Sequence, residues 1–218
     1  MSQLIFKFPF KTNYLEKDFF VSSNNFEAYK LIESWPNWSN KWINIYGPTG
    51  CGKTHLINIL KNKLKLTEID AKNFDSKVNI QLENYQCLVI ENFENNINEN
   101  LLYSSINHIK QLDKCIIITS RKSIRDLNAK LSDLKSRFDS FLNLSINLPT
   151  DDMIIVIISK NFSDKQIDLN NRNLEFILKN IERSYEKISK FIKDIDDISL
   201  STGKSININL IKKVLTNE

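Results

Sequence analysis

Glycine is concentrated in one short segment of this chain. The sequence has 218 residues and four glycines, and three of these, Gly47, Gly50 and Gly52, stand within eight residues, GPTGCGKT. Average usage of about 7 % would give roughly fifteen glycines in a chain of this length. Because glycine allows close backbone approach and left-handed conformations, the segment predicts a loop that wraps tightly around another group.

The glycine segment also fits the pattern G-x-x-x-x-G-K-[ST]. Residues 42–46 alternate as a strand does, and residues 54–64 carry apolar side chains at helical spacing. This strand–loop–helix context favours a phosphate-binding loop over a chance glycine turn, because the loop N–H groups and the helix N-terminus attract phosphates. We therefore predict a site for ADP or ATP with Mg²⁺, formed by Gly47, Pro48, Thr49, Gly50, Cys51, Gly52, Lys53, Thr54 and His55.

Apolar strand-like segments alternate with helical ones through the first 149 residues. Strands are expected at residues 42–46, 66–70, 87–90, 115–119 and 142–146, and helices at 24–35, 54–64 and 98–112. The runs CLVI and CIII are continuously apolar, as in strands buried on both faces. The alternation predicts an α/β fold with a parallel sheet and right-handed crossovers.

From residue 150 the expected structure is helical. Residues 151–160 are rich in Ile and Val, which favours a strand, but Thr150 and the two aspartates after it are typical of a helix N-terminus. We interpret this segment as a helix, with further helices at 173–181, 185–200 and 209–215. The predicted organisation is an extended N-terminal arm (1–12), a P-loop α/β core (13–149) and a small all-helical lid (150–218).

Composition excludes several classes of protein. The formal charge is +4 with both signs interleaved, which favours a solvated surface over a nucleic-acid-binding face. Cys51, Cys87 and Cys115 are far apart and are interpreted as reduced core residues, not a disulfide framework or zinc site. The longest apolar run, residues 153–158, is too short to span a bilayer. We expect a cytoplasmic protein with no membrane contact.

Glu91 follows the apolar run CLVI and is expected at a strand tip. A metal-bound nucleotide needs a carboxylate at such a tip, so Glu91 and Thr54 are the predicted Mg²⁺ ligands; the alternative is a glutamate that only ends the strand in solvent. The next residue is Asn92, whose amide cannot accept a proton at neutral pH. Glu94 could replace such an acid only if the loop bent. Slow or absent intrinsic hydrolysis is therefore expected.

Thr119 and Ser120 end the next buried strand. Their hydroxyls are predicted to act as sensors near the γ-phosphate. The alternative is a local turn in which these hydroxyls bond to neighbouring backbone.

Four segments together carry a family resemblance: GPTGCGKTHL, the acid-ended strand CLVIE, IIITSRKS and LSDLKSRF. They resemble the AAA+ domain of the bacterial replication initiator DnaA, from about residue 10 onward. The resemblance implies an AAA+ P-loop core with a helical lid. It also implies that Arg137, in SRF, is an arginine finger that completes the ATP site of a neighbouring subunit. Without the resemblance, Arg137 would be interpreted as an arginine of a surface helix.

The chain departs from the DnaA pattern at several positions. The sequence ends after the expected lid, without a DNA-reading domain. The lid arginine of the family aligns near Glu186, so its cation is missing unless Arg183 supplies one. Asp133 stands where the initiator has a basic residue, and Arg121 stands where it has an Asp. A DnaA-like domain with weakened hydrolytic residues and a retained finger resembles the Hda-like regulators.

The N-terminal arm strengthens this second resemblance. Gln3, Leu4, Phe6 and Phe8, in QLIFKF, are similar to the peptide by which Hda-like proteins bind the β sliding clamp. Such peptides bury alternate apolar side chains in a groove. The alternative is a strand docked on the domain itself.

The resemblances imply a regulator held on the clamp, and so on DNA indirectly, that offers Arg137 to ATP bound by the DnaA AAA+ domain. Hydrolysis there would inhibit re-initiation. A DnaA-related helicase loader or remodeller with its own nucleotide cycle is the main alternative. A small-molecule P-loop kinase is disfavoured, because residues 147–218 contain only two arginines. Whether the chain forms a homodimer, and whether its core contacts DNA directly, stay open.

Overall fold

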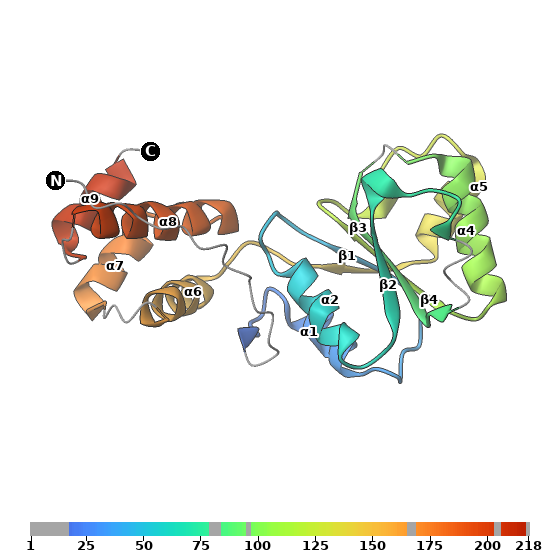
Figure 1. Cartoon of the computed structure of the whole chain (residues 1–218), viewed down its shortest axis with the longest axis horizontal. Coiled ribbons are helices and arrows are strands. Elements are labelled where there is room, and N and C mark those ends of the chain that lie inside the picture. Colours follow the sequence, from blue (N-terminus) through green and yellow to red (C-terminus); the bar gives the residue numbers. More distant parts are fainter. Residues whose placement is uncertain (1–17, 79–83, 95–96, 165–168, 203–205, 217–218) are drawn as a thin grey trace. The chain divides into compact units, whose positions relative to one another are not determined.

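The computed structural model describes residues 18–78, 84–94, 97–164, 169–202 and 206–216 (Figure 1). The described residues up to Asn147 form one compact unit, and those from Leu148 onward form a second. No helix of the described part is both long enough and apolar enough to cross a membrane.

A five-stranded, fully parallel sheet is the centre of the first unit. Its strands stand in the order β2-β3-β4-β1-β5. The inner strands β3 and β4 are the predicted apolar runs, and their residues are almost all buried. The α/β fold with a parallel sheet is thus confirmed. The strand bounds are β1 Trp42–Tyr46, β2 Leu66–Asp70, β3 Cys87–Phe93, β4 Cys115–Ser120 and β5 Leu142–Ser145.

Helices cover both faces of this sheet. Figure 1 shows α1 (Phe26–Glu33) and α2 (Lys53–Lys61) on one side, and α4 (Glu99–Gln111) and α5 (Ser132–Asp139) on the other. The apolar faces of α4 and α5 pack on β3 and β4 in one core cluster, as the spacing of their leucines and isoleucines requires. Two short 3₁₀ turns, η2 (Ala71–Asn73) and η4 (Ile124–Asp126), follow β2 and β4.

Strand β3 contains a bulge at its carboxyl end. Ile90 pairs with Ile118, whereas Phe93 pairs with Ser120, so β3 has one more residue than β4 between these pairs. Asn92 lies in the bulge with φ 55, the left-handed region that Asn tolerates better than most residues. The bulge therefore changes the direction of the side chains that follow Glu91.

The second unit is helical, as predicted. It consists of α6 (Asp151–Ser163), α7 (Asn171–Asn180), α8 (Tyr185–Thr202) and α9 (Ile208–Thr216), which share a core of isoleucines, phenylalanines and a valine. The ambiguous segment is helix α6, because Thr150 caps it: its side chain accepts a hydrogen bond from Met153 N at 3.3 Å. The cap and the shared core thus outweigh the strand propensity of Ile and Val.

The three cysteines are free and buried, in accord with their interpretation as reduced core residues.

Candidate functional site

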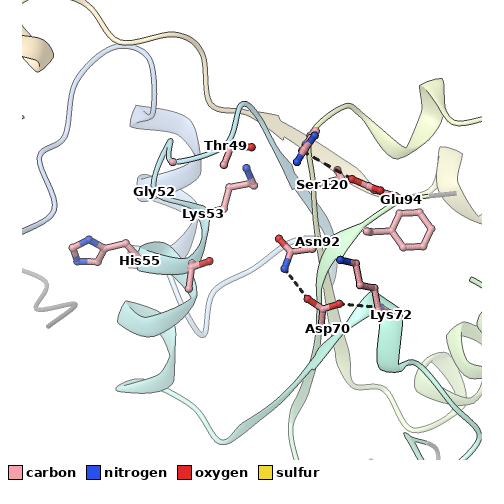
Figure 2. Close-up of a pocket in the computed structure, with 13 residues that line it drawn as sticks. Thr49, Gly52, Lys53, His55, Asp70, Lys72, Asn92, Glu94 and Ser120 are labelled. Carbon is pink, nitrogen blue, oxygen red and sulfur yellow. Dashed lines mark hydrogen bonds and ion pairs between the residues drawn. The ribbon is translucent and has the colours of Figure 1, made fainter. Parts of the chain in front are cut away.

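A pocket of about 460 Å³ opens at the carboxyl edge of the sheet. The loop after β1 forms one wall, and the tips of β2, β3 and β4 form the other (Figure 2). The ends of parallel strands meet at this edge, where α/β proteins bind their ligands. The lining residues are Thr49, Gly50, Gly52, Lys53, Thr54, His55, Asp70, Lys72, Asn92, Phe93, Glu94, Ser120 and Arg121.

The backbone requires glycine at two positions of the loop, Gly47 because of a close contact and Gly52 because of its positive φ. A Cβ on Gly47 would stand 2.3 Å from the carbonyl oxygen of Ile146, and Gly47 N donates to Ser120 O at 3.1 Å. Gly52 has φ 101 and precedes α2 without a capping side chain. The first N–H groups of α2 are therefore not bonded by a capping side chain, and they can bind an anion.

Lys53 directs its ammonium group back onto the loop. Its Nζ donates to Gly47 O at 2.7 Å and to Pro48 O at 3.0 Å. The positive charge is thus held where the glycine loop curves, and a phosphate bound in that curve would compete with these carbonyls for the ammonium protons.

Thr54 and Glu91, the two predicted metal ligands, lie together. Thr54 Oγ1 donates to Glu91 Oε1 at 3.1 Å. Burial raises the pKa of the Glu91 carboxyl above its ordinary value of 4.5, and the bond from Thr54 opposes that shift. A hydroxyl and a carboxylate are the oxygen donors that Mg²⁺ accepts beside a nucleotide. The described residues contain no cluster of three or more His, Cys, Asp or Glu that could hold a metal by themselves.

Asp70 is a pocket residue that the sequence analysis treated only as the end of a strand. It stands beside Glu91 in the β2–β3 register. Figure 2 shows the Asn92 amide pointing to it: Asn92 Nδ2 donates to Asp70 Oδ2 at 2.8 Å, and Lys72 N donates to Oδ1 at 2.9 Å. The Asn92 bond, followed by that from Lys72 N, lowers the pKa of Asp70. The signal in the sequence that could have identified Asp70 is an acidic residue at the end of a predicted strand, as at Glu91.

Glu94 also lines the pocket, two residues beyond Asn92. The bulge at Asn92 bends the chain just before this position. Arg121 Nε lies 4.0 Å from Glu94 Oε1, with both side chains more than half exposed, so this ion pair is weak.

The hydroxyls of Thr119 and Ser120 are engaged within the protein. Thr119 Oγ1 accepts from Asn92 N at 3.2 Å. Ser120 Oγ donates to Lys122 O at 2.6 Å and accepts from Asn44 Nδ2 at 2.9 Å. Of the two, Ser120 lines the pocket. A phosphate oxygen needs a donor, so Ser120 would have to release Lys122 O before binding one.

His55 and Cys51 flank the loop in different ways. The His55 ring, which lines the pocket, meets the Phe19 ring edge to face at 5.1 Å. Cys51, a residue of the loop itself, is buried, with Sγ 3.7 Å from Lys53 Nζ. Burial raises the pKa of this thiol, and the neighbouring Lys53 opposes that shift.

Arg137 lies away from this pocket. Its guanidinium is 5.8 Å from the centre of the Tyr103 ring, and it lines a separate groove of about 400 Å³. The other lining residues precede or begin β1 and β4, or precede β5, so this groove is at the amino edge of the sheet. They are Trp38, Ser39, Asn40, Lys41, Trp42, Lys110, Asp113, Lys114 and Ser140.

Two further predictions concern other parts of the chain. Arg183, considered as a substitute for the missing lid arginine, pairs with Asp151: Nε to Oδ1 is 3.0 Å and Nη2 to Oδ2 is 3.3 Å. Residues 3–8 of the predicted clamp-binding peptide are outside the described residues.

The loop, the acid-tipped strand and the parallel sheet define a P-loop α/β domain. The family model described as "KAP family P-loop domain" matches residues 28–217, and the chain belongs to this family.

Curated relatives carry the name chromosomal replication initiator protein DnaA. The protein from Buchnera aphidicola subsp. Baizongia pistaciae is 26 % identical over 243 residues, which is 99 % of this chain and 53 % of the relative. That from Borrelia garinii is 27 % identical over 268 residues, 98 % of this chain and 55 % of the relative. The chain thus spans about half the length of these relatives.

Solved DnaA structures have the same fold. Domain III of the Thermotoga maritima protein superposes with a TM-score of 0.77 at 20 % identity, covering 96 % of this chain and 98 % of that one. AMPPCP-bound DnaA from Aquifex aeolicus gives 0.70 at 21 % identity, covering 86 % of this chain and 66 % of that one. The predicted similarity to DnaA is confirmed: the chain resembles DnaA in sequence and has the fold of DnaA domain III.

Proposed function

We propose that this chain is a cytoplasmic, nucleotide-binding regulator of replication initiation, related to DnaA and acting on it. Residues 47–54 bind ADP or ATP, and Arg137 is offered in trans to ATP held by the DnaA AAA+ domain. Hydrolysis of that ATP inhibits re-initiation. The proposal combines the similarity to DnaA with the pocket at the carboxyl edge of the sheet.

The position of Arg137 is the observation that carries the proposal. Arg137 lines a groove at the amino edge of the sheet, whereas the P-loop lines a pocket at the carboxyl edge. Strands of five or six residues are about 17–20 Å long, so the guanidinium is too far away to touch a nucleotide in its own loop. A permanently charged, planar group near the surface can instead stabilise the charge on a phosphoryl group held by a neighbour.

The chain's own site is suited to binding more than to fast turnover. Lys53 and the loop N–H groups would bind the phosphates, and Thr54 with Glu91 would hold Mg²⁺, which neutralises phosphate charge when bound. Asn92 stands where a second acid would activate water, so the chain's own hydrolysis is slow.

The N-terminal arm is the proposed tether. Gln3, Leu4, Phe6 and Phe8 would dock as a short extended peptide on the β sliding clamp. A tether of this kind raises the local concentration of Arg137 near DnaA without any new contact between the two proteins. Contact with DNA is then indirect.

Arg137→Ala tests the proposal. Purified chain is added to DnaA preloaded with radiolabelled ATP, with clamp loaded on DNA, and labelled ADP is counted. Arginine fingers contribute about 10³–10⁵ in rate, so the variant should lose at least about 100-fold of the stimulation while keeping its own nucleotide affinity. Lys135→Ala removes an exposed cation from the same helix and is the matched control. Unchanged stimulation by Arg137→Ala would refute the finger assignment.

A DnaA-related loader or remodeller with its own nucleotide cycle is the second candidate. The observation in its favour is that Asp70 and Glu94 bring carboxylates to the nucleotide pocket, whereas Asn92 has only a neutral amide. Turnover by the isolated chain near 1 s⁻¹, the low end of ordinary enzyme rates, would favour this candidate over the regulator.

A further inference from the structure

The residue after Glu91 cannot act as a base. Asn92 offers a neutral amide, which can orient water but cannot take its proton. If the loop binds a nucleoside triphosphate, any base for its hydrolysis must come from another side chain of the same pocket. Glu91 is occupied by the Thr54 hydroxyl and is suited to the metal.

Asp70 brings a carboxylate to that pocket from the neighbouring strand. It is the last residue of β2 and stands beside Glu91 in register, and it lines the same pocket as Lys53 and Thr54. Figure 2 shows Asp70 and Lys53 on opposite sides of this pocket. The amide of Asn92 reaches Asp70 because the bulge gives Asn92 its left-handed conformation, which the bond from Asn92 N to Thr119 Oγ1 helps to hold.

Two hydrogen bonds hold the Asp70 carboxylate in one orientation. Oδ2 accepts from Asn92 Nδ2 at 2.8 Å, and Oδ1 accepts from Lys72 N at 2.9 Å. Each carboxylate oxygen has two lone pairs, so each of these two oxygens can still accept a hydrogen bond from a water molecule. The Asn92 amide, which stands where a second acid would be expected, thus holds the carboxylate of Asp70 on the neighbouring strand β2.

We propose that Asp70 is the catalytic carboxylate that orients the attacking water and accepts its proton when ATP is hydrolysed in this chain's own loop. The water oxygen bonds to the γ-phosphorus while the bond to the β–γ bridging oxygen breaks. ADP and inorganic phosphate leave, and the proton passes through Asp70 to solvent. This inference rests on nucleotide binding by residues 47–54, as in the proposed function, and it predicts slow hydrolysis of ATP by the isolated chain.

Asp70→Asn is the direct test, in the full chain under single-turnover conditions with labelled ATP and Mg²⁺. General-base catalysis contributes about 10²–10⁴ in rate, so the variant should lose at least about 100-fold in rate. Its affinity for AMPPCP should stay within about twofold. Asp75→Asn is the matched control, because Asp75 Oδ1 also accepts from the N–H two residues on, Lys77 N at 2.9 Å, and Asp75 is exposed outside the pocket. It should hydrolyse ATP at the wild-type rate.

Asn92→Ala separates the carboxylate from the hydrogen bond. This variant removes the hydrogen bond to Asp70 but keeps the Asp70 carboxylate, so its rate of ATP hydrolysis should fall by less than about tenfold. If Asp70→Asn and Asn92→Ala lose the same fraction of the hydrolysis rate, the hydrogen bond between the two residues matters and proton acceptance by Asp70 does not. That result would overturn the proposal. So would an Asp70→Asn rate that recovers at high Mg²⁺, which indicates a metal ligand.

Wild-type protein that binds AMPPCP without any measurable hydrolysis would also overturn the inference while leaving the regulator intact. Failure to bind AMPPCP would instead refute the proposed function.

Discussion

The Thr54 hydroxyl donates a hydrogen bond to Oε1 of Glu91 at 3.1 Å, joining the first turn of α2 to the tip of β3. The bond also keeps a partly buried carboxylate next to the P-loop. Glu91 is less exposed to water than a free glutamate, and the acids Glu68 and Asp70 add to the cost of its charge. The ionised form of Glu91 is therefore destabilised, and a bound Mg²⁺ would stabilise it.

Glu91→Gln should raise the melting temperature of the nucleotide-free protein at neutral pH. Burial raises the pKa of the Glu91 carboxyl above 4.5, so the ionised group costs folding free energy at every pH above the raised pKa. As pH falls from the raised pKa to 4.5, the folded protein takes up the proton first and the cost disappears. Gln is always neutral and still offers an oxygen to Thr54. We expect a gain of about 1–3 °C at pH 7.5, measured by calorimetry.

The pH dependence of the gain in melting temperature provides an internal control. The difference between Glu91→Gln and wild type should vanish near pH 4.5, where wild-type Glu91 is protonated. Glu186→Gln, which changes an exposed carboxyl of α8, should show no such trend. A Glu91→Gln protein less stable than wild type at pH 7.5 would contradict the electrostatic cost.

Ser105→Ala should stabilise the protein. Ser105 lies on α4 with no exposed surface, and its Oγ is a buried polar atom with no hydrogen-bond partner. A buried hydroxyl without a partner costs about 1–3 kcal/mol, so its removal should add about 0.5–1.5 kcal/mol in urea unfolding. Ser123→Ala is the matched contrast: Ser123 Oγ donates to Asn143 Oδ1 and accepts from Arg125 N, so its loss should cost about 1 kcal/mol. Equal effects of the two changes would refute the assignment.

Most of the fold could be predicted because parallel strands and amphipathic helices leave strong patterns. CLVI and CIII read as buried strands, and the spacing of apolar residues in 98–112 indicated α4. Residues 151–160 were harder, since their side chains favour a strand. The polar cap at Thr150 outweighed that preference, because a satisfied helix N-terminus and a shared apolar core contribute more than the propensity of a few β-branched residues.

The candidate site could be predicted only where its residues are close in sequence. The loop 47–54 and the Glu91 strand tip were recognisable, but the link between Asp70 and Asn92 depends on strand order and on a bulge. Neither is encoded in local periodicity: β2 lies beside β3 only in the folded sheet, and the left-handed Asn92 turns its amide toward that neighbour. The place of Arg137 at the opposite edge likewise follows from topology.

Gly47→Ala should damage the nucleotide loop. The new Cβ would stand 2.3 Å from Ile146 O, a backbone atom that cannot move alone because Ile146 N is bonded to Tyr46 O. Displacing the loop should cost about 1–3 kcal/mol and weaken AMPPCP binding at least tenfold, measured by isothermal titration calorimetry. Ser104→Ala, on the exposed side of α4, should change neither quantity. Tight AMPPCP binding by Gly47→Ala would show that the loop tolerates the shift.

Asn44→Ala should be among the most destabilising single changes in the sheet. Asn44 has no exposed surface, and its side chain makes three buried bonds: Nδ2 donates to Ile118 O and Ser120 Oγ, both at 2.9 Å, and Oδ1 accepts from Ile124 N at 3.0 Å. Alanine leaves these groups without their partner, at a cost of about 2–4 kcal/mol. The melting temperature should fall by about 5–10 °C.

A second asparagine supplies the control for Asn44. Asn58 Nδ2 bonds only to Thr54 O, a carbonyl of its own helix α2, at 2.7 Å near solvent. Asn58→Ala should therefore be neutral or slightly stabilising, since alanine is the better helix former. If Asn44→Ala melts within about 2 °C of wild type, water has replaced the lost side chain, and Asn44 does not hold Ser120 and the turn η4 in place. A large fall with an unchanged Asn58→Ala would locate the effect in the three buried bonds, because both variants remove the same amide.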